Sequence, residues 1–154
     1  MGLDMYLYAE RYLPGPQLDF GDEVKGNATA IAELAGLPMA GDFTGIYVRS
    51  QLAYWRKANA IHQWFVRNVQ GGEDECKPHH VSRRQLTILR DNCQIVLDDP
   101  SLAEEYLPTV DGFFFGSTEM DEYYFNDLRS TISQIDFALM AAPEDSSFIY
   151  EASW

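Results

Sequence analysis

The chain has 154 residues, of which 46% are hydrophobic and 14% aromatic, and its formal net charge is −13. A chain of this size buries roughly 68–70% of its unfolded surface, so the composition argues for a folded domain and against disorder. The negative charge disfavours nucleic acid and anionic membranes as direct partners, because their phosphate groups would be repelled.

The first element is predicted to be a strand. Apolar residues alternate with more polar ones over residues 3–8, which indicates a strand with one buried face. The run Pro14-Gly15-Pro16 is expected to end it. A short helix over residues 28–34, capped by Asn27, comes next, and the rest of residues 17–44 favours strand or loop.

A long helix is predicted over residues 47–69. No Gly or Pro interrupts this stretch, and Tyr54, Ala58 and Ile61 begin a series of apolar residues at helical spacing. Gly71-Gly72 follows, and glycine commonly ends a helix by adopting a left-handed conformation.

Residues 73–81 are expected to form a loop, and the second helix that follows carries a clear start signal. Ser82, with Gln85 three residues later, forms a capping box in which each side chain can bind the backbone N–H of the other residue. Asp99-Pro100 should end this helix, because proline disfavours the helical conformation of the residue before it. A short turn is expected over residues 101–106.

A third helix is expected from Thr118, which with Asp121 forms a second capping signal, to Pro143. Residues 147–150 then favour a last strand. Helices framed by a first and a last strand predict an α+β fold. We expect one compact domain over residues 1–154, with a small sheet that includes the N- and C-terminal strands and packs with about three helices.

Trp55, Asn59 and His62 would lie on one face of the first long helix, at positions i, i+4 and i+7. One interpretation makes this stripe a recognition or catalytic face, on which His62 can change its charge near neutral pH. The structural alternative places Trp55 at the edge of the core and has Asn59 and His62 tie a loop or strand to the helix. The pattern favours the structural alternative.

Cys76, His79, His80 and Cys93 have metal-binding chemistry, but their spacing is too loose to indicate a zinc site. Cys93 falls on the apolar stripe of the second helix, where a thiol behaves as a small apolar residue. We therefore expect two free thiols, no metal and no cofactor. The chain also lacks the patterns of a membrane span and of a signal peptide, so a cytoplasmic location is expected.

The charges are unevenly distributed along the chain. Residues 1–45 sum to −5 and residues 46–97 to +4, whereas residues 98–154 carry thirteen acids and one base and sum to −12. An acidic surface formed mainly by this last segment would suit a basic partner. The candidate residues of this acidic binding surface are Glu119, Asp121, Glu122, Asp127 and Asp136.

Aromatic blocks give the chain a distinctive pattern. Residues 54–65 read Tyr-Trp-Arg-Lys-Ala-Asn-Ala-Ile-His-Gln-Trp-Phe, and residues 112–119 read Gly-Phe-Phe-Phe-Gly-Ser-Thr-Glu. With the opening residues 1–7 and the closing Ser153-Trp154, these blocks resemble a family of small, uncharacterised proteins of phage and prophage genomes. The likeness covers the first strand and roughly the last two thirds of the chain.

The resemblance implies a phage-encoded accessory protein, and such proteins are often antagonists of host defence. Together with the charge, it predicts a non-enzymatic protein of the host cytoplasm that inhibits a host macromolecule, most simply a host protein with a basic surface. Direct binding to nucleic acid or membrane is not expected, and homo-oligomer formation is left open.

Two other functions compete with this prediction. The first is binding of a small, nucleotide-like signal in an aromatic pocket. The residues predicted to line that pocket are Trp55, Arg56, Asn59, His62, Tyr123 and Tyr124. The second is an enzyme with a site at His62, although the sequence contains none of the common catalytic motifs.

Overall fold

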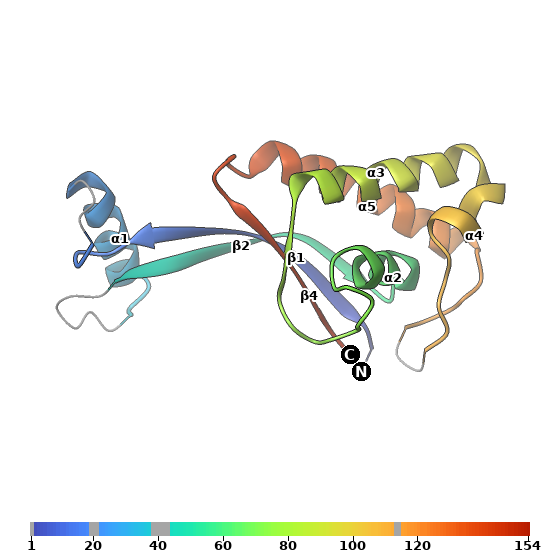
Figure 1. Cartoon of the computed structure of the whole chain (residues 1–154), viewed down its shortest axis with the longest axis horizontal. Coiled ribbons are helices and arrows are strands. Elements are labelled where there is room, and N and C mark those ends of the chain that lie inside the picture. The colour runs from blue at the N-terminus through green and yellow to red at the C-terminus, as the bar shows by residue number, and fades with distance from the viewer. Residues whose placement is uncertain (1, 19–21, 38–43, 113–114) are drawn as a thin grey trace. The chain divides into compact units, whose positions relative to one another are not determined.

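The computed structural model of the protein describes residues 2–18, 22–37, 44–112 and 115–154 (Figure 1). It is an α+β structure with one four-stranded antiparallel sheet in the order β2-β1-β4-β3, which confirms the predicted fold class. The elements are β1 (Asp4–Pro14), α1 (Asp22–Leu34), β2 (Gly45–Arg56), α2 (Asn59–Asn68), β3 (His79–Val81), α3 (Arg83–Asp98), a 3-10 turn η1 (Pro100–Leu102), α4 (Ala103–Tyr106), α5 (Glu122–Ala141) and β4 (Ser147–Ser153).

The chain forms two compact units. One contains residues 1–9 and 51–154, and the other contains residues 10–50. In the smaller unit, the paired ends of β1 and β2 are held by an ion pair between Arg49 and Glu10, at 2.8 Å, and by ring packing of Tyr12 on Tyr47. Helix α1 starts at Asp22, six residues earlier than the sequence predicts, so Asn27 lies inside the helix and does not cap it.

In the larger unit, the predicted pairing of the terminal strands is confirmed, because β1 and β4 are neighbours in the sheet. Leu3, just before β1, and Met5 and Leu7 within it are fully buried, as their alternation predicts. They join residues of α2, α3 and α5 in a single hydrophobic core. At its centre Phe65 stacks on Tyr150, with ring centroids 3.8 Å apart and planes at 8°.

The helix predicted over residues 47–69 is wrong in its first half. Residues 45–56 form the edge strand β2, and the helix begins only at Asn59. The first half is rich in β-branched and aromatic residues, which favour strands, and buried Ala53 and Trp55 follow the two-residue period of a strand. The apparent helical spacing combines apolar residues of a strand with those of the helix that follows.

Helices α3 and α5 pack side by side along their lengths (Figure 1). The capping box of α3 is confirmed, since the Ser82 side chain accepts from the backbone N–H of Gln85 and the Gln85 side chain accepts from that of Ser82. Helix α5 begins at Glu122, and its cap is Asp121 rather than the predicted Thr118. One carboxylate at that position accepts two backbone N–H groups, which makes it the stronger cap.

Of two short elements, one differs from the prediction and one agrees with it. Residues 79–81, expected to be loop, form the edge strand β3, in which His79 pairs with Tyr150 and Val81 with Phe148. A strand of three residues has no periodicity to reveal it, and its pairing with β4 defines it. The predicted turn after α3 is confirmed as η1 and α4. Parts of the predicted segments at 17–44 and 112–119 lie outside the described residues.

Candidate functional site

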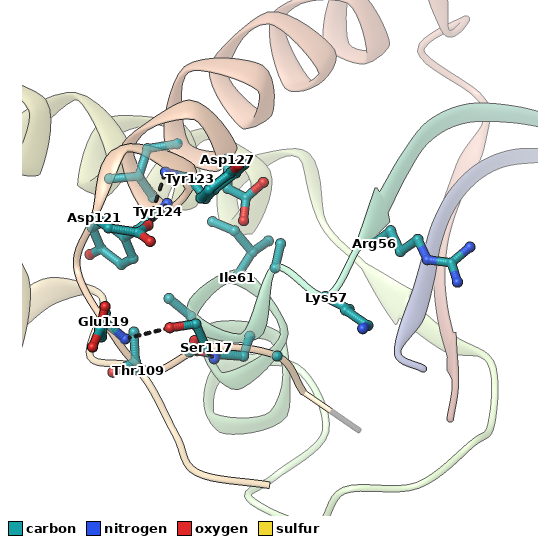
Figure 2. A pocket seen from close by; sticks show the side chains of 15 residues that line it. Arg56, Lys57, Ile61, Thr109, Ser117, Glu119, Asp121, Tyr123, Tyr124 and Asp127 are labelled. Atoms are coloured by element: carbon teal, nitrogen blue, oxygen red, sulfur yellow. Dashed lines mark hydrogen bonds between the residues drawn. The ribbon is translucent and has the colours of Figure 1, made fainter. Parts of the chain in front are cut away.

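A pocket of about 260 Å³ lies in the larger unit where β2 passes into α2 (Figure 2). Arg56 and Lys57 from the end of β2 and the first turn of α2 form one side. The loop before α5 and the first two turns of α5 form the other side. Segments about 50 residues apart in the sequence therefore meet at this site, which is a candidate for the functional site because it combines charged and aromatic side chains.

The junction between β2 and α2 has an unusual backbone. Lys57 has φ = +57°, a left-handed conformation that costs a residue other than glycine roughly 1–2 kcal/mol. Its N–H donates to the Leu3 carbonyl at 2.8 Å, and its own carbonyl accepts from the Asn59 N–H at 2.9 Å. Strain of this kind is often found at functional sites. Here it turns the chain abruptly, so that strand and helix share one wall of the pocket.

The opposite wall is fixed by Asn59 and by a glycine. The Asn59 side chain, which is 4% exposed, donates to the Ser117 carbonyl at 2.6 Å and accepts from the Val110 N–H at 3.4 Å. Gly116 has φ = +89°, and a Cβ atom placed there would lie 3.1 Å from the Lys57 Cβ. The loop therefore approaches the strained junction closely only because residue 116 is glycine.

Three carboxylates line the pocket, from Glu119, Asp121 and Asp127. Asp127 is half-buried, and no hydrogen bond or ion pair reaches its carboxylate within the part of the chain that the structure describes. Burial and the nearby charge of Asp121 raise the pKa of Asp127 to about 6. Figure 2 shows the charged ends of Arg56 and Lys57 pointing away from these carboxylates, so the interior of the pocket is electronegative.

Two tyrosines at the start of α5 have different roles. The Tyr124 hydroxyl donates to the Leu107 carbonyl at 2.9 Å, and burial raises the pKa of Tyr124 well above its usual value. Tyr124 therefore holds the loop against the helix. Tyr123 also lines the pocket but is 81% exposed, so its ring remains accessible at the rim. An exposed aromatic side chain beside carboxylates is an arrangement suited to recognising organic cations.

Trp55 and His62, predicted to share a stripe with Asn59, do not line this pocket. The stripe does not exist, because Trp55 lies in β2 and the other two residues lie in α2. Trp55 is 3% exposed, and its indole N–H donates to the Thr131 hydroxyl at 2.9 Å. The pocket does include four of the six residues predicted for the ligand site, namely Arg56, Asn59, Tyr123 and Tyr124.

His62 ties together three segments of the core. Its Nε2 lies 3.1 Å from a carboxylate oxygen of Asp74 in the loop after α2, and its Nδ1 lies 2.8 Å from the Tyr150 hydroxyl in β4. A neutral imidazole with its proton on Nε2 satisfies both contacts, with the Tyr150 hydroxyl donating to Nδ1. His62 is 1% exposed and Tyr150 is 0% exposed, so these two hydrogen bonds hold the core together, as the structural interpretation predicts.

The predicted acidic surface is divided by the fold. Glu119, Asp121 and Asp127 meet at the pocket, and exposed Glu122 lies in the same first turn of α5. Asp136 lies fourteen residues after Glu122, about 21 Å along the helix, where it forms an ion pair with Arg90 of α3 at 3.1 Å. The surface around the pocket is therefore made by four of the five predicted residues.

Little in the sequence points to Thr109 and Ser117, which also line the pocket. The Thr109 hydroxyl donates to the Thr118 carbonyl at 2.9 Å, and the Ser117 hydroxyl accepts from the Glu119 N–H at 3.1 Å. Both bonds stabilise the loop. Ser117 belongs to a Gly-Ser-Thr run whose nearness to a helix start could be noticed, whereas nothing near Thr109 marks it.

The two cysteines are free thiols in different environments. Cys76 is exposed, whereas Cys93 lies in the core, as its place on the apolar stripe predicts. Burial raises the pKa of Cys93 to about 12. Within residues 2–18, 22–37, 44–112 and 115–154, no three His, Cys, Asp or Glu side chains come together as a metal site would require.

Comparisons of the chain with protein-family models, curated proteins and solved structures produced no match. Among the described residues, every helix is too short or too polar to cross a bilayer.

Proposed function

We propose that this protein is a non-enzymatic binding protein that recognises a basic region of another protein through the acidic surface around the pocket. The observation that supports this most is the meeting of Glu119, Asp121 and Asp127 on one pocket, while the charged ends of Arg56 and Lys57 point away from it. Carboxylates that are not neutralised by the chain itself are available to a basic partner.

The wider charge distribution supports the same proposal. None of the thirteen acids in residues 98–154 is buried, and the single base of that segment, Arg129, is exposed and bonds Asn126. This segment therefore carries a large net negative charge, which speeds encounter with a positively charged partner. The resemblance to phage proteins makes a host protein, and inhibition of host defence, the natural setting for such a contact.

Binding of a small ligand is the second candidate, because four of the residues predicted for it do line the pocket. The carboxylates, however, disfavour the phosphate groups of a nucleotide-like signal. Catalysis at His62 has less support, because both of its nitrogens already have partners in the core and it does not line the pocket.

Affinity capture from a host lysate tests the proposal with matched variants. Immobilised wild-type protein is compared with two double variants. The pocket-side pair carries Glu119→Lys and Glu122→Lys, and the distant pair carries Glu73→Lys and Glu144→Lys. All four positions are exposed, and both pairs change the net charge equally. A specific basic protein should be captured by the wild type and the distant pair but not by the pocket-side pair.

Capture should also weaken between about 0.15 M and about 0.5 M salt, because screening shortens the reach of the charges. Two results would refute the proposal: the same proteins retained by wild type and pocket-side pair, or a partner whose contact surface is acidic or neutral.

A further inference from the structure

We propose that the pocket at the β2–α2 junction binds the guanidinium group of an arginine side chain of the partner. This inference rests on the proposed function and specifies its central contact: the carboxylates of the pocket accept N–H groups of the arginine, and Tyr123 packs against its planar face.

The size of the pocket favours a single side chain over a whole cofactor. Sites for drug-sized ligands enclose roughly 300–1,000 Å³, whereas this pocket encloses about 260 Å³. Its walls are set by bonds already in place, since Asn59 anchors the loop and Tyr124 anchors the start of α5. The site is therefore formed in advance, which lowers the ordering cost of binding.

The acceptors in the pocket match what a guanidinium group offers. Asp121 uses the same oxygen, Oδ1, for both backbone N–H groups that it caps, at 2.9 and 3.2 Å, so its other oxygen has no partner within the described residues. The Asp127 carboxylate has none there either. A guanidinium group carries five N–H donors and binds carboxylates through two parallel bonds. It would satisfy these oxygens and neutralise their charge at once.

The aromatic rim favours arginine over lysine. Tyr123 is 81% exposed although it lines the pocket, so one face of the site is an accessible ring. A planar, weakly hydrated guanidinium can stack on such a ring while it bonds carboxylates at its edge. A lysine ammonium is a compact and strongly hydrated charge, and it gains less from the ring.

The side of the pocket formed by Arg56, Lys57 and the first turn of α2 does not create a competing anion site. The first turn of α2 also faces the pocket, and helix N-termini attract anions. Its first N–H group, that of Asn59, is already bonded to the Lys57 carbonyl. A phosphate at this turn would share the pocket with three carboxylates.

The test uses the full chain and N-acetyl-arginine-methylamide, followed by two-dimensional ¹H–¹⁵N NMR. We expect saturable shifts at the amides of Ala60, Ile61 and Ser117, with a Kd on the order of 1 mM, as suits a ligand of this size. The lysine analogue should bind at least about threefold more weakly, and the neutral citrulline analogue, which keeps the shape, should not saturate.

Variants separate a binding role from a structural one. Asp127→Asn keeps the shape of the side chain and should weaken arginine binding about tenfold, and Tyr123→Ala about threefold, as is typical of charged hydrogen bonds and of cation–π contacts. Asp136→Asn, about 14 Å away on the same helix, makes the same charge change and should leave binding within about twofold.

The inference is overturned if citrulline and arginine analogues shift the spectrum equally, if neither does so up to about 20 mM, or if Asp127→Asn binds arginine as the wild type does. Saturable shifts with inorganic phosphate in place of arginine would identify an anion site and would also overturn it. If arginine binding fails but the wild type still captures a basic protein that the pocket-side pair does not, the proposed function stands. Loss of both results would refute the proposed function too.

Discussion

Replacing Asp127 with Asn should stabilise the protein at neutral and alkaline pH but not at acidic pH. Asp127 is a half-buried acid whose pKa is raised from 3.8 to about 6 by burial and by Asp121. The folded state therefore holds a proton more tightly than the unfolded state, and ionising Asp127 costs stability as the pH rises from below 4 to above 6. The variant has no such group to ionise.

The raised pKa corresponds to about 3 kcal/mol, which solvent screening at this partly exposed position reduces to about 1–2 kcal/mol. Urea unfolding at a series of pH values should show Asp127→Asn more stable than the wild type by that amount at about pH 8, with the difference vanishing near pH 4. Asp136→Asn is the control, because it removes an exposed ion pair with Arg90 and should cost about 0–1 kcal/mol instead.

A stability difference that does not change with pH would refute the reasoning, as would a less stable Asp127→Asn protein at pH 8. The first result would mean that folding does not raise the pKa of Asp127, and the second that its carboxylate has a stabilising partner. A bound arginine is expected to pair with this same Asp127 carboxylate. The pH series therefore also tests the electrostatic basis of the proposed site.

Three further predictions concern the scaffold. A thiol reagent should modify the exposed Cys76 in the folded chain and Cys93 only after unfolding, because Cys93 is buried and its pKa is raised to about 12. Rapid modification of both cysteines would contradict this. Gly116→Ala should lower the free energy of unfolding by about 1–3 kcal/mol, because the φ of +89° is strained for alanine and its Cβ would lie only 3.1 Å from the Lys57 Cβ. An unchanged thermal midpoint would argue against that close approach. His62→Ala should lower the free energy of unfolding in urea by about 2–4 kcal/mol yet leave arginine binding unchanged. Loss of arginine binding in the folded variant would give His62 a role at the pocket.

Local signals in the sequence predicted those elements whose stabilising contacts are also local. The capping box at Ser82 and Gln85 marks the start of α3, and the alternation over residues 3–8 marks the buried face of β1. Both features depend on residues within a few positions of one another. The α+β fold followed, because a strand at each end and amphipathic helices between them have few ways to bury their apolar faces.

The errors arose where distant contacts decide the structure. Residues 47–56 suit a helix by spacing and a strand by composition, and pairing with β1 settles the competition in favour of a strand. Likewise β3 is defined by its register with β4. A left-handed Lys57 could not be anticipated, because it depends on the Leu3 carbonyl and on the closeness of Gly116.

The candidate site was predicted in its residue types but not in its grouping. Charge counting identified the acids of residues 98–154, and Glu119, Asp121 and Asp127 do meet. Asp136 lies apart from them, and its position in the sequence does not reveal that its partner is Arg90 of a neighbouring helix. The predicted stripe of Trp55, Asn59 and His62 does not form, because β2 is a strand and places the Trp55 side chain in the core.

The central claim is that a basic partner binds the acidic surface around the pocket, and calorimetric titration of the captured host protein tests it most directly. The account predicts that Glu119→Lys with Glu122→Lys weakens binding at least about 30-fold, while the distant pair Glu73→Lys with Glu144→Lys changes it less than about threefold. Equal losses in the two pairs would show that only net charge matters, and unchanged affinity in the pocket-side pair would place the binding surface elsewhere. Either outcome would contradict the account.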